Sequence, residues 1–130
     1  MKLGLDFHGV VDRYPEAFAQ MTKALVWGNH EVHIITGQED GVELRKTLSQ
    51  MGIHYTHIFS ITSYHKRQGT PVEHDENGNP WMDTETWNAT KGKYCDDNNI
   101  DFHIDDSPEY GKYFKKTAYF TYPKEPTNVS

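Results

Sequence analysis

The chain has 130 residues, a mass of 15.1 kDa and a formal net charge of −6 at pH 7. This length fits one domain with a single sizeable core, and an aromatic content of 13% is too high for a disordered chain. The acidic balance argues against nonspecific nucleic-acid binding, which needs a basic surface.

Apolar runs predict that strands and helices alternate along the chain. Expected strands cover 2–7, 31–35, 54–61, 101–104 and 117–122, and expected helices run from Pro15 to Gly28, from Asp40 to Gly52, over 86–98 and over 108–116. Pro15 suits the first turn of a helix, and Asp40 and Gly52 suit the two helix ends. The alternation predicts an α/β, Rossmann-like three-layer sandwich. We expect a five-stranded, mostly parallel sheet in the order 3-2-1-4-5.

Residues 62–86 interrupt this alternation with prolines, glycines and charges. Asn77-Gly78 is a strong turn signal, so we expect residues 71–82 to form a short β-hairpin excursion. Residues 123–130 read as a polar tail. The whole chain, 1–130, is expected to form one domain.

Polar side chains follow three of the expected strands, at the point where each strand ends. They are Asp6 and His8 after the first strand, Thr36 after the second, and Asp105, Asp106 and Ser107 after the fourth. A lysine, Lys91 or Lys93, lies on the helix before the fourth strand. The carboxyl ends of parallel strands share one sheet edge, where ligands bind. Carboxylates, a hydroxyl and an ammonium group suit metal-assisted phosphoryl transfer.

Four segments carry this pattern in order along nearly the whole chain. They read Leu5-Asp6-Phe7-His8-Gly9-Val10-Val11-Asp12, Val32-His33-Ile34-Ile35-Thr36-Gly37, Thr90-Lys91-Gly92-Lys93-Tyr94 and Phe102-His103-Ile104-Asp105-Asp106-Ser107-Pro108-Glu109. Together they resemble the four motifs of the haloacid dehalogenase-like (HAD) superfamily. The resemblance implies a Mg²⁺-dependent phosphohydrolase that acts on a phosphate monoester, such as a nucleotide, a sugar phosphate or a phosphorylated macromolecule end.

Carried over by position, the resemblance implies a nucleophile, phosphate-binding groups and metal ligands. Asp6 would attack phosphorus and form an aspartyl-phosphate, while Thr36 and Lys91 would hold the phosphoryl group. Mg²⁺ would be bound by Asp6, by the main-chain carbonyl of His8 and by Asp106, with Asp105 as the alternative ligand. Lys93 remains the competitor of Lys91.

His8 is the main departure from the family pattern, which has a second Asp at this position as general acid and base. An imidazole with a pKa near ~6.5 can perform both roles near neutral pH. Three interpretations remain open: an active phosphatase with altered pH dependence, a slow phosphatase, or a module that binds a phosphorylated ligand or protein partner without turnover. Asp12 is interpreted as a capping or surface residue rather than as a displaced acid.

The eight histidines raise the alternative of a zinc site, because His54, His57, His65 and His74 lie in one stretch. Their spacing matches no standard zinc site, and His54 and His57 are expected on opposite faces of a strand. We therefore expect no zinc site.

The 62–86 excursion is short for a substrate-selecting cap, and the first two strands are separated by only one helix. The chain therefore resembles a capless or minimally capped member, with a large or exposed substrate or a homo-oligomer whose partner subunit closes the site. The single cysteine, Cys95, excludes an internal disulfide. No apolar stretch approaches ~18 residues and no leader pattern follows Met1, so we expect a cytoplasmic protein without membrane association.

Overall fold

The computed structural model describes residues 1–122, and the expected polar tail lies outside them. Five strands form the central sheet in the order β3-β2-β1-β6-β7. They are β1 (Lys2–Leu5), β2 (Glu31–Thr36), β3 (His57–Ser60), β6 (Phe102–Asp105) and β7 (Ala118–Thr121). All four pairings between them are parallel. The expected α/β class and strand order are confirmed, since β6 and β7 are the fourth and fifth strands once the hairpin strands are left out.

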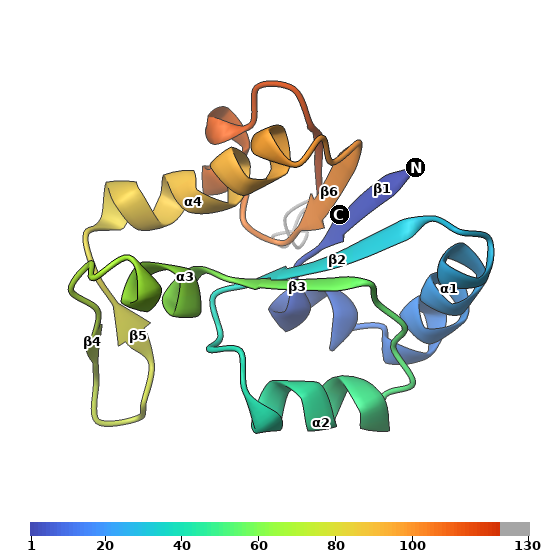
Figure 1. Ribbon diagram of the computed structural model, residues 1–130, viewed down its shortest axis with the longest axis horizontal. Coiled ribbons are helices and arrows are strands. Elements are labelled where there is room, and N and C mark those ends of the chain that lie inside the picture. The colour runs from blue at the N-terminus through green and yellow to red at the C-terminus, as the bar shows by residue number, and fades with distance from the viewer. Residues whose placement is uncertain (123–130) are drawn as a thin grey trace, which may run out of the picture.

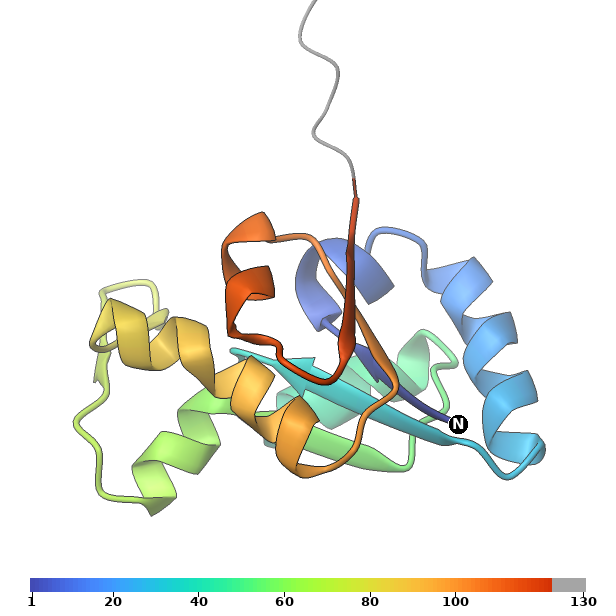
Figure 2. The ribbon, with the colours of Figure 1, turned by 90° about the horizontal axis from the view of Figure 1, so that it is seen from above.

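Helices cover both faces of this sheet (Figure 1). They are α1 (Pro15–Trp27), α2 (Val42–Gln50), α3 (Ile61–Arg67) and α4 (Thr84–Asp97). In Figure 1, α1 and α2 lie below the sheet and α4 lies above it; Figure 2 shows the same layers from above. Within residues 1–122, no helix is both long enough and apolar enough to cross a membrane.

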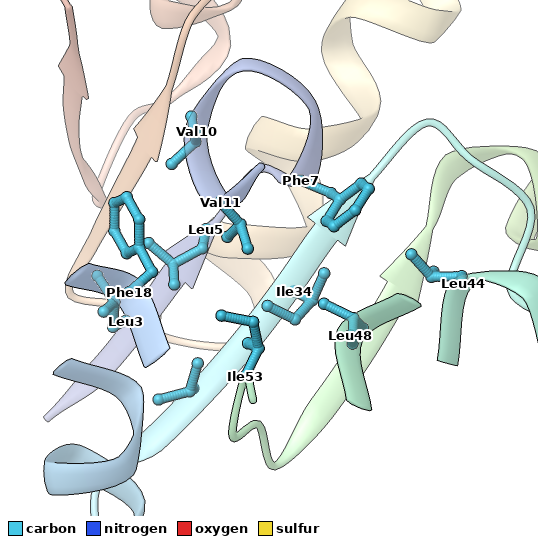
Figure 3. Packing of buried hydrophobic residues seen from close by; sticks show 11 residues of the cluster. Leu3, Leu5, Phe7, Val10, Val11, Phe18, Ile34, Leu44, Leu48 and Ile53 are labelled. Carbon is cyan, nitrogen blue, oxygen red and sulfur yellow. The ribbon is translucent and has the colours of Figure 1, made fainter. Parts of the chain in front are cut away.

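Side-chain alternation along the strands divides the core between the two faces. Leu3 and Leu5 of β1 pack with Phe18 of α1 and Leu48 of α2 in one buried cluster (Figure 3). A second cluster is formed on the α3 and α4 side by Ile35, Phe59, Ile61, Cys95 and Ile100. Strands buried on both faces leave their carboxyl ends as the accessible sheet edge, and this edge carries the candidate site.

The interval between β3 and α4 departs from the expectation in one respect. The hairpin is present as β4 (Glu73–His74) and β5 (Pro80–Trp81), which pair antiparallel. The helix α3 was not predicted, and the third strand, expected over 54–61, spans only His57–Ser60. Ser60 begins α3 because its hydroxyl accepts a hydrogen bond from Ser63 N at 3.0 Å. This local cap outweighs the mixed, strand-like apolar pattern before it.

The segment after β6 is also shorter than expected. Residues 108–116 were predicted as a helix, but only η2 (Pro108–Tyr113), a 3₁₀ helix, forms there. Gly111 lowers helix propensity in its middle, and Phe114 N closes the last turn on the Gly111 carbonyl at 3.1 Å.

Candidate active site

Asp6 lies directly after β1, at the accessible edge of the sheet. Its main-chain N–H continues the sheet by donating to the Ile104 carbonyl at 3.0 Å. Its side chain is 9% exposed, and Oδ1 accepts a hydrogen bond from Phe7 N at 2.9 Å. The carboxylate is therefore fixed by the backbone on both sides and points into the edge of the fold.

Lys91 of α4 joins Asp6 to Asp105 through its buried ammonium group. Nζ lies 3.0 Å from Asp6 Oδ1 and 2.8 Å from Asp105 Oδ2, and the lysine side chain is 3% exposed. Lys93, in contrast, forms an exposed ion pair with Asp97 at 2.6 Å. The structure thus brings Lys91, and not Lys93, to the strand ends.

Asp105 is fully buried at the end of β6, where three groups donate to its carboxylate. Besides Lys91, His103 Nε2 lies 2.9 Å from Oδ2, and Ser107 N donates to Oδ1 at 3.1 Å. The His103 ring fits against β1 because residue 4 is glycine. A Cβ at this position would lie 2.7 Å from His103 Nδ1. Asp105 is therefore held in place by groups from β6, α4 and the following turn.

The protonation of the two buried carboxyls differs. Burial raises the pKa of Asp6 to about 7; Lys91 opposes this rise, while the charges of Asp105 and Asp106 add to it. Burial also acts to raise the pKa of Asp105, but the hydrogen bond from His103 and the Lys91 charge outweigh it and hold this pKa below its usual range. Burial lowers the pKa of Lys91, yet the two carboxylates outweigh this effect and keep the ammonium charged.

Asp106 completes an acidic group with Asp6 and Asp105. One carboxylate oxygen from each of the three lies within 4.8 Å of the others. Asp106 is exposed and faces Gly9, where an added Cβ would overlap its carboxylate. Gly9 also adopts φ 82°, a left-handed conformation that favours glycine. Three oxygen donors, two buried and one open to the cleft, are a set that suits Mg²⁺ with some of its waters retained.

His8 lies in the turn η1 (Phe7–Val11) and pairs with Asp12. His8 Nδ1 is 3.1 Å from Asp12 Oδ2, and the other oxygen of Asp12 accepts from Gly9 N at 2.7 Å. The His8 side chain is 65% exposed and lines the cleft above the acidic group. Asp12 is exposed and caps the end of η1, as expected of a capping or surface residue, and its carboxylate also holds the His8 imidazole at the edge of the cleft.

Thr36 is fully buried at the end of β2 and also borders the cleft. Its hydroxyl accepts a hydrogen bond from Gln38 N at 3.1 Å, which turns the chain after the strand. Thr62 of α3 fixes the same turn by donating to the Gly37 carbonyl at 2.7 Å. Gly37 makes room for the Trp87 ring, which a Cβ at this position would approach to 2.6 Å.

The cleft over these residues has a volume of about 790 Å³. Its floor is formed by the strand ends, and its walls include the loop 37–43, the hairpin and η2. The hairpin contributes His74, Asn79 and Pro80, and η2 contributes Tyr110, whose ring lies 5.1 Å from Lys91 Nζ. The hairpin is thus a small partial cover over the cleft.

The structure brings together most of the residues chosen from the sequence. Asp6, Lys91, Asp105 and Asp106 converge, and Thr36 and His8 border the same cleft. One contributor was missed. His103 precedes Asp105 by two residues on a strand, a spacing that places both on one face and that was available as a signal in the sequence.

Comparisons with protein-family models, with curated proteins and with solved structures gave no significant match to this chain. The site therefore stands on its own geometry.

Proposed function

We propose that this chain is a Mg²⁺-dependent phosphohydrolase of the HAD type that cleaves phosphate monoesters through an aspartyl-phosphate on Asp6. The observation that carries the proposal is the buried Lys91 ammonium bridging Asp6 and Asp105 beside the open carboxylate of Asp106. A charged network of this kind costs desolvation energy, which structural stability alone does not require. Perturbed carboxyls in a cleft at the sheet edge are typical of catalytic sites.

In this proposal Asp6 is the nucleophile. Lys91 and Phe7 N both contact Oδ1, and no residue among 1–122 donates to Oδ2. Oδ2 attacks phosphorus, a new P–O bond forms, and the bond from phosphorus to the ester oxygen breaks. Attack by water on the acyl-phosphate then releases inorganic phosphate and restores Asp6. Lys91 and Thr36 border the position of the phosphoryl oxygens.

His8 and Asp12 supply the acid and base of the cycle. His8 donates a proton to the departing alkoxide and later accepts one from the attacking water. Asp12 is a positioning residue, because its contact with Nδ1 holds the imidazole at the cleft edge. This pair takes the place of the second aspartate that the family pattern has at position 8.

The acidic group fits a magnesium ion in the chemistry of its donors. Asp6, Asp105 and Asp106 would hold the ion, which would neutralise phosphate charge and favour the ionised form of Asp6. Asp106 is the most accessible of the three, whereas Asp105 is engaged by Lys91 and His103. We therefore assign Asp106 as the principal ligand next to Asp6.

The test is hydrolysis of p-nitrophenyl phosphate and of a panel of nucleotides and sugar phosphates, with and without Mg²⁺. We expect magnesium-dependent turnover in the wild type and in Asp97→Asn, a matched control at an exposed carboxylate. Asp6→Asn should abolish it. Loss of turnover in the control as well would remove the assignment of Asp6.

The alternative is a module that binds a phosphorylated ligand or protein partner without turnover. The exposure of His8, which contacts Asp12 rather than Asp6, is the observation that favours it. Magnesium binding without turnover on the whole panel between about pH 5 and pH 9 would overturn the phosphohydrolase and favour this module. An imidazole changes charge in this range, and so does Asp6, because burial raises its pKa to about 7.

A further inference from the structure

A second group of metal-binding side chains lies at the opposite end of the sheet from the cleft. It consists of Glu31 and His33 on β2 and His57 on β3, each with one donor atom within 4.8 Å of the others. Glu31 is five residues and His33 three residues before Thr36 on the same strand, so these two residues lie about 16 Å and about 10 Å from the catalytic edge. It shares no residue with the acidic group around Asp6.

The sheet itself builds this cluster. His33 and His57 are direct partners in the parallel register of β2 and β3, and their rings stack with centroids 4.1 Å apart and planes 7° apart. Glu31 precedes His33 by two residues, so both side chains lie on the same face. Glu31 Oε1 lies 2.8 Å from His33 Nε2 and 3.9 Å from His57 Nδ1.

Both imidazoles have polar partners of the kind that orient metal ligands. His33 is 3% exposed and its Nδ1 lies 2.7 Å from the Tyr94 hydroxyl of α4. Thr56 Oγ1 lies 2.8 Å from His57 Nδ1. The Tyr94 hydroxyl can accept a hydrogen bond from His33 Nδ1, which leaves Nε2, the nitrogen beside Glu31, free to bind a metal.

We propose that Glu31, His33 and His57 form a binding site for a zinc-like divalent transition metal. Two imidazoles and one carboxylate are a donor set that suits zinc and disfavours magnesium, which takes oxygen ligands. Ligand atoms at about 2.1 Å from one ion lie about 3.4 Å apart. Glu31 and His57 are partly exposed, so their side chains have room to rotate toward this spacing. The ion fastens the edge strand β3 to β2.

One nearby charge opposes the ion and supplies a control. Lys2 Nζ lies 3.8 Å from Glu31 Oε2 and competes for this carboxylate. Removing this positive charge should strengthen metal binding. A mutation that merely disturbs the fold would instead weaken metal binding. Lys2→Ala therefore separates an effect of charge on the metal site from a general effect on the fold.

The experiment is calorimetric titration of metal-free protein with ZnCl₂ in saturating MgCl₂, which occupies the acidic group first. We expect one equivalent of zinc to bind the wild type and His54→Ala, a matched histidine outside the cluster. His57→Ala and Glu31→Gln should bind zinc at least ~100-fold more weakly. Tyr94→Phe should bind about 10-fold more weakly and Lys2→Ala several-fold more tightly.

A second measurement is the melting temperature, which zinc should raise in the wild type and leave unchanged in His57→Ala. His57 is half exposed, so this variant keeps the fold. Absence of zinc binding by the wild type, or full binding by His57→Ala, would overturn the proposal. Neither result depends on phosphatase activity.

Discussion

The ammonium group of Lys91 lies 2.8 Å from the carboxylate of Asp105, and both side chains are buried. This pair connects α4 to the end of β6, and Asp6 is the second carboxylate in contact with the same ammonium group. The catalytic proposal and the stability of this sheet edge therefore depend on the same atoms.

Replacing Lys91 by Met should destabilise the fold as well as abolish turnover. It leaves two buried carboxylates without their cation, a change that costs about 3–5 kcal/mol. Urea unfolding measures this cost. Lys93→Met is the matched control two residues along the same helix, where the lost ion pair is solvent-exposed, and its unfolding curve should match the wild type. Equal loss of stability in both variants would contradict the burial argument.

Asp6→Asn should stabilise the metal-free protein at high pH. Burial raises the pKa of Asp6 to about 7, against 3.8 for the ordinary carboxyl, so the folded state holds a proton that the unfolded state has lost. The stability that the protonated Asp6 carboxyl contributes is fully present below pH 3.8, and it is lost as the pH rises through about 7. As the pH is raised from 5 to 8.5, the free energy of unfolding of Asp6→Asn should increase by about 2–4 kcal/mol relative to that of the wild type.

Magnesium should reverse the order of stability of the wild type and Asp6→Asn. Because Asp6 is a proposed ligand, saturating Mg²⁺ should stabilise the wild type and have little effect on Asp6→Asn. Chemical denaturation at pH 8 with and without the ion gives the comparison. A similar magnesium effect on both proteins would place the ion elsewhere.

Asp12→Asn should reduce activity most for substrates with poor leaving groups. Asp12 holds His8, and a general acid matters most when the departing alkoxide is strongly basic. We expect kcat/KM for an alkyl phosphate to fall by roughly 10- to 100-fold, with a much smaller fall for p-nitrophenyl phosphate. His8→Ala should show the same selectivity. A uniform loss for both substrates would indicate a structural role for the pair.

Gly9→Ala and Gly78→Ala form a matched pair of variants. Both glycines have a positive φ, 82° and 80°, so alanine introduces about 1–2 kcal/mol of backbone strain at each. Only at Gly9 would the new Cβ meet the Asp106 carboxylate; at Gly78 nothing lies within 4 Å. Magnesium titration should show weaker binding for Gly9→Ala alone. Equal affinities would mean that Asp106 does not bind the ion.

Sequence by itself determined the sheet and the place of the site. Alternating apolar runs specify strands and helices, and the right-handed parallel connections leave few possible strand orders. Asp6 follows β1, and Thr36 and Asp105 are the last residues of β2 and β6, so their meeting at one edge follows from the parallel arrangement alone. The β-hairpin was predictable from Asn77-Gly78, because its turn chemistry is local.

Tertiary structure decided which polar groups meet, because these contacts join residues far apart in sequence. Lys91 and Lys93 lie on one helix, and only packing against β1 and β6 shows that the first is buried between two carboxylates. The contact between His33 and His57 depends on the register of β2 and β3. His33 and His57 are 24 residues apart in the sequence, so spacing along the chain gives no sign of this contact. A chain pattern specifies the face on which a side chain lies, whereas strand register and helix packing determine its partner.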